Sequence, residues 1–177
     1  MTRLLLLLMP LALLACGGTD RPAGEAAPAA ASTPRYVAEG VRWTRLDAQG
    51  QPLFVAEAEQ VQVYDDRRAV LSQPRLAQLA GRAEGWRLAA PRGEASAGLA
   101  SIRLDQGVEA QGHWPDGEPL QLRTPALRYE PQAQRLSGSE PIEVRSDSRE
   151  ARAEGFEASV RRGTLRLLGQ VRIDYAS

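Results

Sequence analysis

Residues 41–55 read Val-Arg-Trp-Thr-Arg-Leu-Asp-Ala-Gln-Gly-Gln-Pro-Leu-Phe-Val, and this stretch indicates an all-β protein. Apolar and polar side chains alternate in Val41–Thr44, and an apolar run follows at Leu53–Val55. Alternation with a period of two is typical of a β-strand. Asp47–Gly50, between the two runs, consists of residue types that favour tight turns. The stretch therefore predicts a β-hairpin.

The same pattern fills the chain after residue 35. Tyr64–Arg67 separates Val61–Val63 from Val70–Leu71 and predicts a second hairpin, and Gly112–Gly117 marks another turn. Three prolines stand at the ends of alternating runs, where a missing backbone donor does least harm to a sheet: Pro91, Pro125 and Pro141. Helical periodicity is not sustained anywhere in this region. We therefore expect many short antiparallel strands.

An internal repeat organises these strands. Four starting positions lie 32, 34 and 29 residues apart, and each is followed by an aliphatic residue 12 and again 18 positions later. The starts are Ala58, Ala90, Thr124 and Ala153, the first followers are Val70, Ile102, Leu136 and Leu165, and the second are Leu76, Val108, Ile142 and Val171. A unit with one apolar face cannot bury it alone, so we expect the copies to stack until their apolar sides meet. The alternative is the chance registry that any alternating β protein shows.

The last predicted strand, Val171–Tyr175, is followed by only two residues. An uncapped edge strand offers unpaired backbone groups, which proteins either protect or use to add a strand from a partner. We expect Val171, Ile173 and Tyr175 to form a partner edge. The alternative is a solvated edge protected by the charges of Arg172 and Asp174.

The N-terminus resembles a bacterial lipoprotein signal. Residues 1–15 combine a positive start with an apolar stretch at Leu4–Leu14, which is shorter than the roughly 20 residues that span a bilayer. Leu13-Leu14-Ala15-Cys16 resembles a lipobox, so we expect Cys16 to be lipidated; the alternative is an ordinary cleaved signal. Residues 16–35, mostly Ala, Pro and Gly, are predicted to form a flexible tether, and residues 36–177 to form the β domain.

Composition excludes several classes of function. All 22 basic residues are Arg, they are spread along the chain, and 22 acidic residues balance them, so a nucleic-acid-binding patch is not expected. One Cys and one His exclude an internal disulfide and a Cys- or His-rich metal site. The absence of Lys excludes a P-loop. We expect no metal, no cofactor and no catalytic residue.

The nearest approach to an enzyme site is a set of paired carboxylates. Asp65 and Asp66 lie in a predicted turn, and Glu150 and Glu154 lie on a predicted solvated strand face. A carboxylate hydrolase is kept as the weakest alternative.

Taken in order, these segments resemble the LptC family, the membrane-anchored periplasmic component of lipopolysaccharide transport. The matching segments are Tyr36–Gly50, Phe54–Ala58, Leu71–Leu76, Trp86–Ala90 with Gly93, Leu122–Thr124, Ala153–Phe156, Leu165–Leu168 and Val171–Tyr175. The resemblance implies an open, twisted antiparallel β-jellyroll. It also implies transfer of lipopolysaccharide from an inner-membrane ABC transporter with LptF/LptG-type subunits to a periplasmic LptA-like bridge protein.

The resemblance further implies lipid contacts on the inner wall of the jellyroll. The positions that match the family's motifs are Val41, Leu71, Leu165 and Tyr175, and Leu104 and Leu136 are assigned to the same wall. The repeat, however, aligns Val70 rather than Leu71 with Leu165, and adjacent residues of a strand face opposite sides. The sequence therefore leaves open whether Leu71 or Val70 faces the interior.

The lipobox departs from the family, whose better-known members hold to the membrane by an N-terminal helix. We expect a lipid anchor on the periplasmic side of the envelope, in the inner membrane. A second reading is an outer-membrane-anchored β-lipoprotein that scaffolds an envelope assembly and transfers no lipid.

Overall fold

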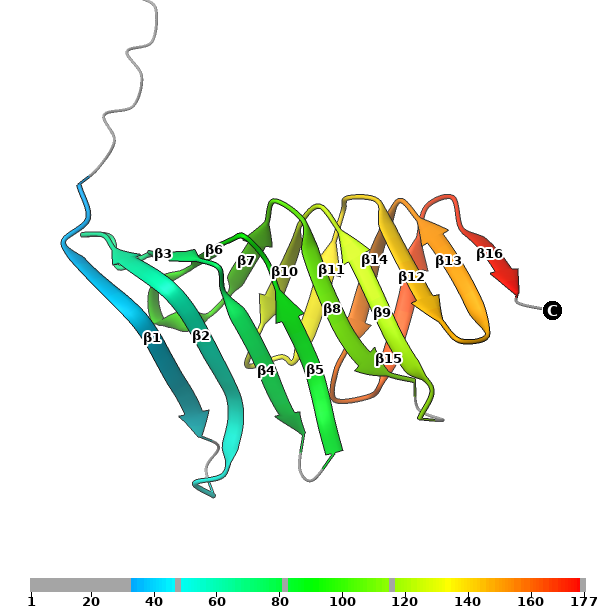
Figure 1. Cartoon of the computed structure of the whole chain (residues 1–177), viewed down its shortest axis with the longest axis horizontal. Coiled ribbons are helices and arrows are strands. Elements are labelled where there is room, and N and C mark those ends of the chain that lie inside the picture. Colours follow the sequence, from blue (N-terminus) through cyan, green and yellow to red (C-terminus); the bar gives the residue numbers. More distant parts are fainter. Residues whose placement is uncertain (1–32, 47–48, 81–82, 115–116, 176–177) are drawn as a thin grey trace, which may run out of the picture. The chain divides into compact units, whose positions relative to one another are not determined.

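The computed structural model describes residues 33–46, 49–80, 83–114 and 117–175. Within these ranges the chain forms one antiparallel sheet of sixteen strands, and the only helical segment is a short 3-10 turn at Ala97–Leu99. The expected all-β fold is confirmed. The outer strands of the sheet do not pair with each other, so the sheet stays open (Figure 1).

Most strands are short, as the repeat predicts. The strands are β1 (Tyr36–Leu46), β2 (Pro52–Val63), β3 (Ala69–Ser72), β4 (Arg75–Ala80), β5 (Ala83–Ala89), β6 (Arg92–Ala95), β7 (Ile102–Asp105), β8 (Val108–His113), β9 (Pro119–Thr124), β10 (Leu127–Glu130), β11 (Arg135–Gly138), β12 (Ile142–Ser146), β13 (Arg149–Ala153), β14 (Gly155–Ser159), β15 (Thr164–Leu168) and β16 (Arg172–Tyr175).

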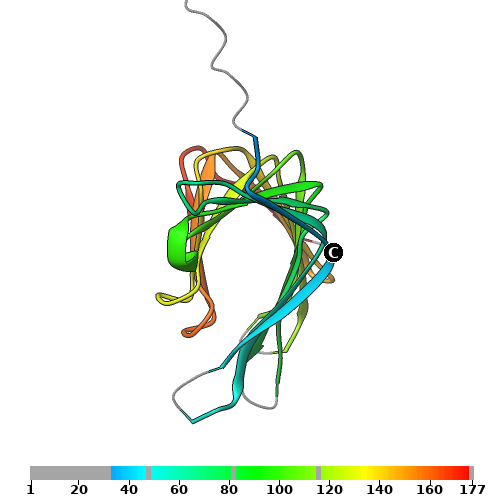
Figure 2. The same ribbon diagram turned by 90° about the vertical axis from the view of Figure 1, so that its left-hand side faces the viewer.

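The sheet folds over into two walls that face each other (Figure 2). The strand order is β15-β14-β11-β10-β7-β6-β3-β2-β4-β5-β8-β9-β12-β13-β16, with β1 paired to β2. Strand β2 belongs to both walls, because its C-terminal half pairs with β3 and its N-terminal half with β4. We call β1, β4, β5, β8, β9, β12, β13 and β16 the front wall, and β3, β6, β7, β10, β11, β14 and β15 the rear wall.

Successive hairpins alternate between the walls, and the chain crosses at corners along one ridge. Pro91, Pro125 and Pro141 each lie between two strands at such a corner, as predicted. Backbone hydrogen bonds join neighbouring corners: the Gln73 N–H donates to the Pro91 carbonyl at 2.9 Å, and the Gly107 N–H donates to the Pro125 carbonyl at 3.0 Å. The ridge is therefore the fixed side of the fold.

The two predicted hairpins and the predicted turn at Gly112–Gly117 are confirmed. Strands β1 and β2 pair across the turn that follows Leu46, β2 and β3 pair across the turn at Tyr64–Arg68, and β8 pairs with β9. The 3-10 turn Ala97–Leu99 joins β6 to β7, and together these pairings produce the alternation of walls.

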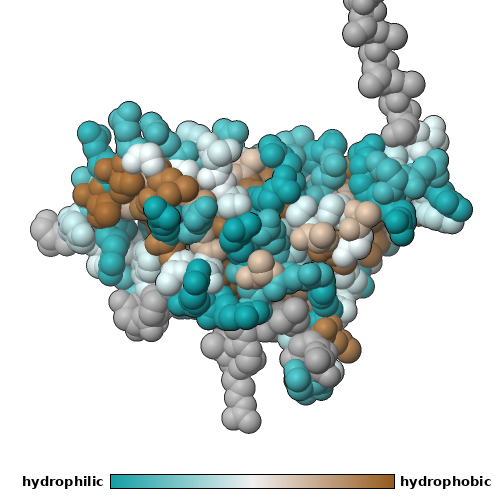
Figure 3. Space-filling model, turned by 180° about the vertical axis from the view of Figure 1, so that it is seen from behind, coloured by the Kyte–Doolittle hydropathy of each residue, from teal (hydrophilic) through white to brown (hydrophobic). Residues whose placement is uncertain are grey.

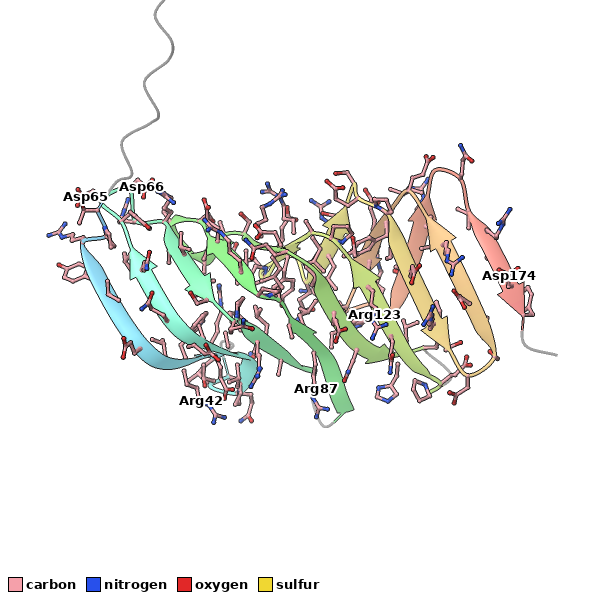
Figure 4. The ribbon with its side chains drawn as sticks, turned by 45° about the horizontal axis from the view of Figure 1, so that its top comes forward. Arg42, Asp65, Asp66, Arg87, Arg123 and Asp174 are labelled. Carbon is pink, nitrogen blue, oxygen red and sulfur yellow. The ribbon has the colours of Figure 1, made fainter. Side chains whose placement is uncertain are left out.

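The outer face of the front wall carries charged side chains. Arg42 pairs with Glu57 at 3.5 Å and Arg123 pairs with Glu109 at 3.2 Å across neighbouring strands. Arg42, Arg87 and Arg123 come from β1, β5 and β9 respectively and are labelled in Figure 4. The polar half of the alternation thus faces solvent, and the apolar half faces the space between the walls, which we call the trough.

Candidate functional site

One row of inward-facing side chains runs across the front wall, from β1 through β2 to β16. Cross-strand pairing aligns Trp43 with Ala56, and continues step by step to Ala151 and Ile173 on the last strand. The members of the row are Trp43, Ala56, Leu76, Leu88, Ala110, Leu122, Val144, Ala151 and Ile173. All are apolar, so the front wall presents an unbroken hydrophobic stripe from β1 to β16.

The rear wall presents the matching stripe. Leu71 pairs with Gly93, and Gly93 with Leu104, so the two leucines flank a position without a side chain. A Cβ at Gly93 would lie 3.1 Å from the Leu104 Cδ2 atom and 3.2 Å from the Leu71 Cδ1 atom. Leu71 is 2% exposed and Leu104 is fully buried. The glycine lets the two leucines close over the sheet.

The conflict between Val70 and Leu71 is resolved in favour of Leu71. Val70 pairs with Glu94 and Gln62, which belong to the polar outer row, and it is only half-buried. Its place in the repeat alignment is therefore wrong. The residue on β3 that lies in register with Ile102, through Ala95, is Ala69.

A second rear-wall row contains Leu136 and Leu165. Leu136 pairs with Tyr129 on one side and Ala158 on the other, and Ala158 pairs with Leu165 on the last rear strand. Leu136 is fully buried, whereas Leu165 is half-buried because no further strand covers it. Of the predicted wall residues, Leu71, Leu104 and Leu136 are thus core, and Leu165 lies at the C-terminal end of the trough.

Side chains from the two walls meet inside the trough. The rings of Phe54, on β2 in the front wall, and Tyr129, on β10 in the rear wall, pack edge to face with centroids 6.4 Å apart. Both side chains are buried. The two walls are therefore packed against each other at this point, and a guest hydrocarbon chain needs them to part.

The burial of Tyr129 predicts a loss of stability at alkaline pH. Burial raises the pKa of Tyr129 to about 12, and the positive charge of Arg45 opposes this rise. An unfolded tyrosine ionises near 10, so the folded protein keeps its phenol proton while the unfolded chain loses it. The contribution of Tyr129 to the free energy of unfolding is therefore fully present below pH 10. It is lost as the pH rises to about 12, and the loss is about 3 kcal/mol for a shift of this size.

Urea unfolding between pH 9 and 12 measures this effect. The chain has no Lys, so lysine ionisation does not contribute in this range. The Tyr129→Phe variant is expected to lose most of the pH dependence, and Tyr64→Phe, at an exterior turn, to retain it. An equal alkaline loss in Tyr129→Phe and wild type would contradict the assignment.

The C-terminal end of the trough is uncovered. Strand β16 pairs only with β13, and β15 pairs only with β14, so both walls end in a free strand edge. Val171 and Ile173 are each 46% exposed and Tyr175 is 73% exposed. Figure 3 shows hydrophobic side chains gathered at this end. The predicted edge residues therefore lie together at the uncovered end.

The N-terminal end is bounded by β1, which pairs only with β2. Val41, on the inner face of β1, is half-buried opposite Ala58. Tyr36 and Val37, at the start of the strand, are exposed. Cys16, the expected lipidation site, lies outside the described residues.

Sequence reasoning missed two inward polar groups on β1. Trp43 and Arg45 share the face of Val41, because residues two apart in a strand point to the same side. The buried indole N–H of Trp43 has no hydrogen-bond partner among the described residues. The same alternation that identified Val41 was the signal that could have found them.

Other chemistry is limited in the described part of the chain. His, Cys, Asp and Glu side chains do not gather there in the groups of three or more that a metal site needs. Asp66 accepts hydrogen bonds from the Arg68 backbone N–H and guanidinium within its turn. No helix of the described ranges has the length and apolar character to span a bilayer.

Comparison with known proteins identifies the fold and the family. Residues 4–176 match the family described as "Lipopolysaccharide-assembly, LptC-related". The chain is also similar to the crystal structure of LptH, described as the LptA homologous periplasmic component of the conserved lipopolysaccharide transport device of Pseudomonas aeruginosa. That similarity has a TM-score of 0.54 at 12% identity and covers 70% of this chain and 94% of LptH. No curated protein sequence matches the chain.

Proposed function

The chain belongs to the LptC-related family of lipopolysaccharide-assembly proteins, and from this premise we propose that it carries lipopolysaccharide with the acyl chains between its two walls. Its role is in lipopolysaccharide transport, and the family is one of transport components, not enzymes. The observation that carries the proposal is the apolar stripe of the front wall, which runs from Trp43 to Ile173 without a polar interruption and ends at an uncovered edge.

The walls can part without breaking the backbone pairing of the sheet. They are joined through β2 and the corners of the ridge, while contacts on the opposite side are between side chains such as Phe54 and Tyr129. Parting exposes apolar surface at roughly 25 cal/mol per Å², and an acyl chain that enters covers that surface again. Lipid bound between the walls therefore replaces protein contacts with equivalent ones.

The proposed lipid-contacting residues are Val41, Leu71, Leu104, Leu136, Leu165 and Tyr175. Val41 and Tyr175 stand at opposite ends of the apolar surface, and the buried leucines between them would be reached as the walls separate. A neighbour with the same interior would cover acyl chains equally well, so transfer between such troughs needs little net free energy.

We propose one partner for each end of the trough. The β1 end would receive lipid from an inner-membrane ABC transporter with LptF/LptG-type subunits. The β16 edge would dock an LptA-like bridge protein through backbone pairing. We further propose that lipidated Cys16 and the tether of residues 16–35 anchor the domain to the periplasmic face of the inner membrane; the lipobox-like sequence supports this anchor.

Photo-crosslinking tests the carrier role. A crosslinking amino acid at Leu165, on the inner face of β15, is expected to capture lipopolysaccharide in cells, as is one at Tyr175. The matched control is Arg166, the next residue of β15, which faces outward. Equal labelling of Leu165 and Arg166, or copurification of no lipid with the wild-type protein, would reject the proposal.

The packing of the interior favours a second candidate, an envelope scaffold that transfers no lipid. Leu104 and Leu136 are fully buried by other side chains of the protein. In the scaffold hypothesis, the β16 edge binds a partner protein, but the two walls do not part to admit lipid. The Leu165 crosslinker would then capture neighbouring protein and no lipid, and fractionation would place the chain in the outer membrane.

A further inference from the structure

The inner face of β1 carries a cation at the margin of the apolar trough. Arg45 is half-buried and pairs in register with Phe54, a side chain of the core. Phe54 contacts Tyr129 of the rear wall, and the charge of Arg45 acts on that tyrosine. The guanidinium therefore faces the interior of the fold at its N-terminal end.

Among the described residues Arg45 forms no ion pair with a carboxylate, unlike Arg42 on the same strand, which pairs with Glu57. The contrast with Arg149, at the corresponding margin of the C-terminal half, is direct. Arg149 stacks on Trp114 with its guanidinium 5.4 Å from the ring centroid and forms an ion pair with Glu118 at 3.1 Å. A guanidinium beside apolar surface is normally compensated in this way, because burial of an unpaired charge is costly.

A second unpaired donor lies beside Arg45. The indole N–H of Trp43, two residues earlier on the same face, is buried without a hydrogen-bond partner in the described part of the chain. The indole N–H of Trp114 is also buried without a partner in the described residues, but the guanidinium beside it, Arg149, is already paired with Glu118. Buried donors are normally satisfied, so each exception needs a reason. Two donors on one face of β1, at the margin of the apolar trough, are what an oxyanion that carries apolar chains would need.

We propose that Arg45 and Trp43 bind a phosphate group of the lipid, while its acyl chains lie between the walls. This inference rests on the proposed function and names the part of the ligand that is recognised at the N-terminal end. A guanidinium donates two parallel hydrogen bonds to a phosphate, and the indole N–H supplies a third donor. The apolar stripe that begins at Trp43 receives the chains.

Binding of two lipids to the full-length protein tests the site. The probes are bisphosphorylated lipid A and the same acylated disaccharide without phosphates, both in detergent. Wild-type protein is expected to bind the phosphorylated form at least about tenfold more tightly, since charged hydrogen bonds are the strong ones. Arg45→Gln removes this preference, Arg45→Lys keeps part of it, and Trp43→Phe, which retains the ring but loses the N–H, reduces it a few fold.

Arg42→Gln is the matched control. Arg42 lies on the same strand but on the opposite face, where it pairs with Glu57. This variant is expected to keep the full preference. An Arg45→Gln variant that prefers the phosphorylated lipid as strongly as Arg42→Gln does would overturn the proposal. Equal affinities of the wild-type protein for the two lipids would also overturn it. This second comparison does not depend on the folding of any variant.

Two further outcomes distinguish a lipid phosphate from free phosphate, and the phosphate site from the carrier role. Excess inorganic phosphate is expected not to displace the lipid, because it lacks the chains that enter the trough; displacement would reassign the site to the free anion and overturn the lipid assignment. Wild-type protein that binds neither lipid would reject the carrier role, and the site with it. Binding without a phosphate preference would reject the site alone.

Discussion

Leu136→Asp is expected to unfold the protein. Leu136 is fully buried on β11, between Tyr129 and Ala158. Truncation of a buried leucine costs about 2–5 kcal/mol, and a carboxylate without a partner adds its own desolvation. The sum approaches the whole stability of a typical domain, which is about 5–15 kcal/mol.

Circular dichroism and thermal melting measure this effect. The matched control is Ser137→Asp, because Ser137 is the next residue on β11 and pairs with Arg128 on the outer face. It is expected to change the free energy of unfolding by less than about 1 kcal/mol. A folded Leu136→Asp protein that melts like wild type and still captures lipid would show that the wall assignment is wrong.

The strands were predictable because their signal is local. Period-two alternation and turn residues sufficed for the hairpins that flank β2 and for β8 with β9. The register of the repeat was predictable only where turn lengths agree. Five residues separate the paired Val63 and Ala69, whereas six separate the paired Ala95 and Ile102. Because the first connection is one residue shorter, the repeat alignment placed Val70, instead of Ala69, at the position of Ile102.

The closure of the trough was not predictable from the sequence. Phe54 and Tyr129 lie 75 positions apart, and their contact depends on how far the sheet folds over at β2. The three-dimensional structure was needed to see that Arg45 and Trp43 lack partners in the described part of the chain. Their shared face, in contrast, could be predicted from the strand alternation.

Deletion of residues 171–177 is expected to weaken docking of the LptA-like bridge protein of the same bacterium more than it weakens lipid capture. The deletion removes β16, whose free edge is the proposed docking strand. The cost to the core is small, because Val171, Ile173 and Tyr175 are already largely exposed, and Ala151 on the neighbouring strand is a small side chain. The free energy of unfolding should therefore change much less than the free energy of binding to the partner.

Pull-down with the purified bridge protein measures docking, and copurified lipopolysaccharide measures capture. Truncation after Tyr175 is the matched control and is expected to retain both activities, since it leaves every residue of β16 in place. An affinity loss of at least about tenfold is expected for the longer deletion, because backbone pairing along a whole strand is removed. Docking that survives this deletion would assign the bridge contact elsewhere, and the free edge of β15 at the same end of the trough would then be the strand to remove.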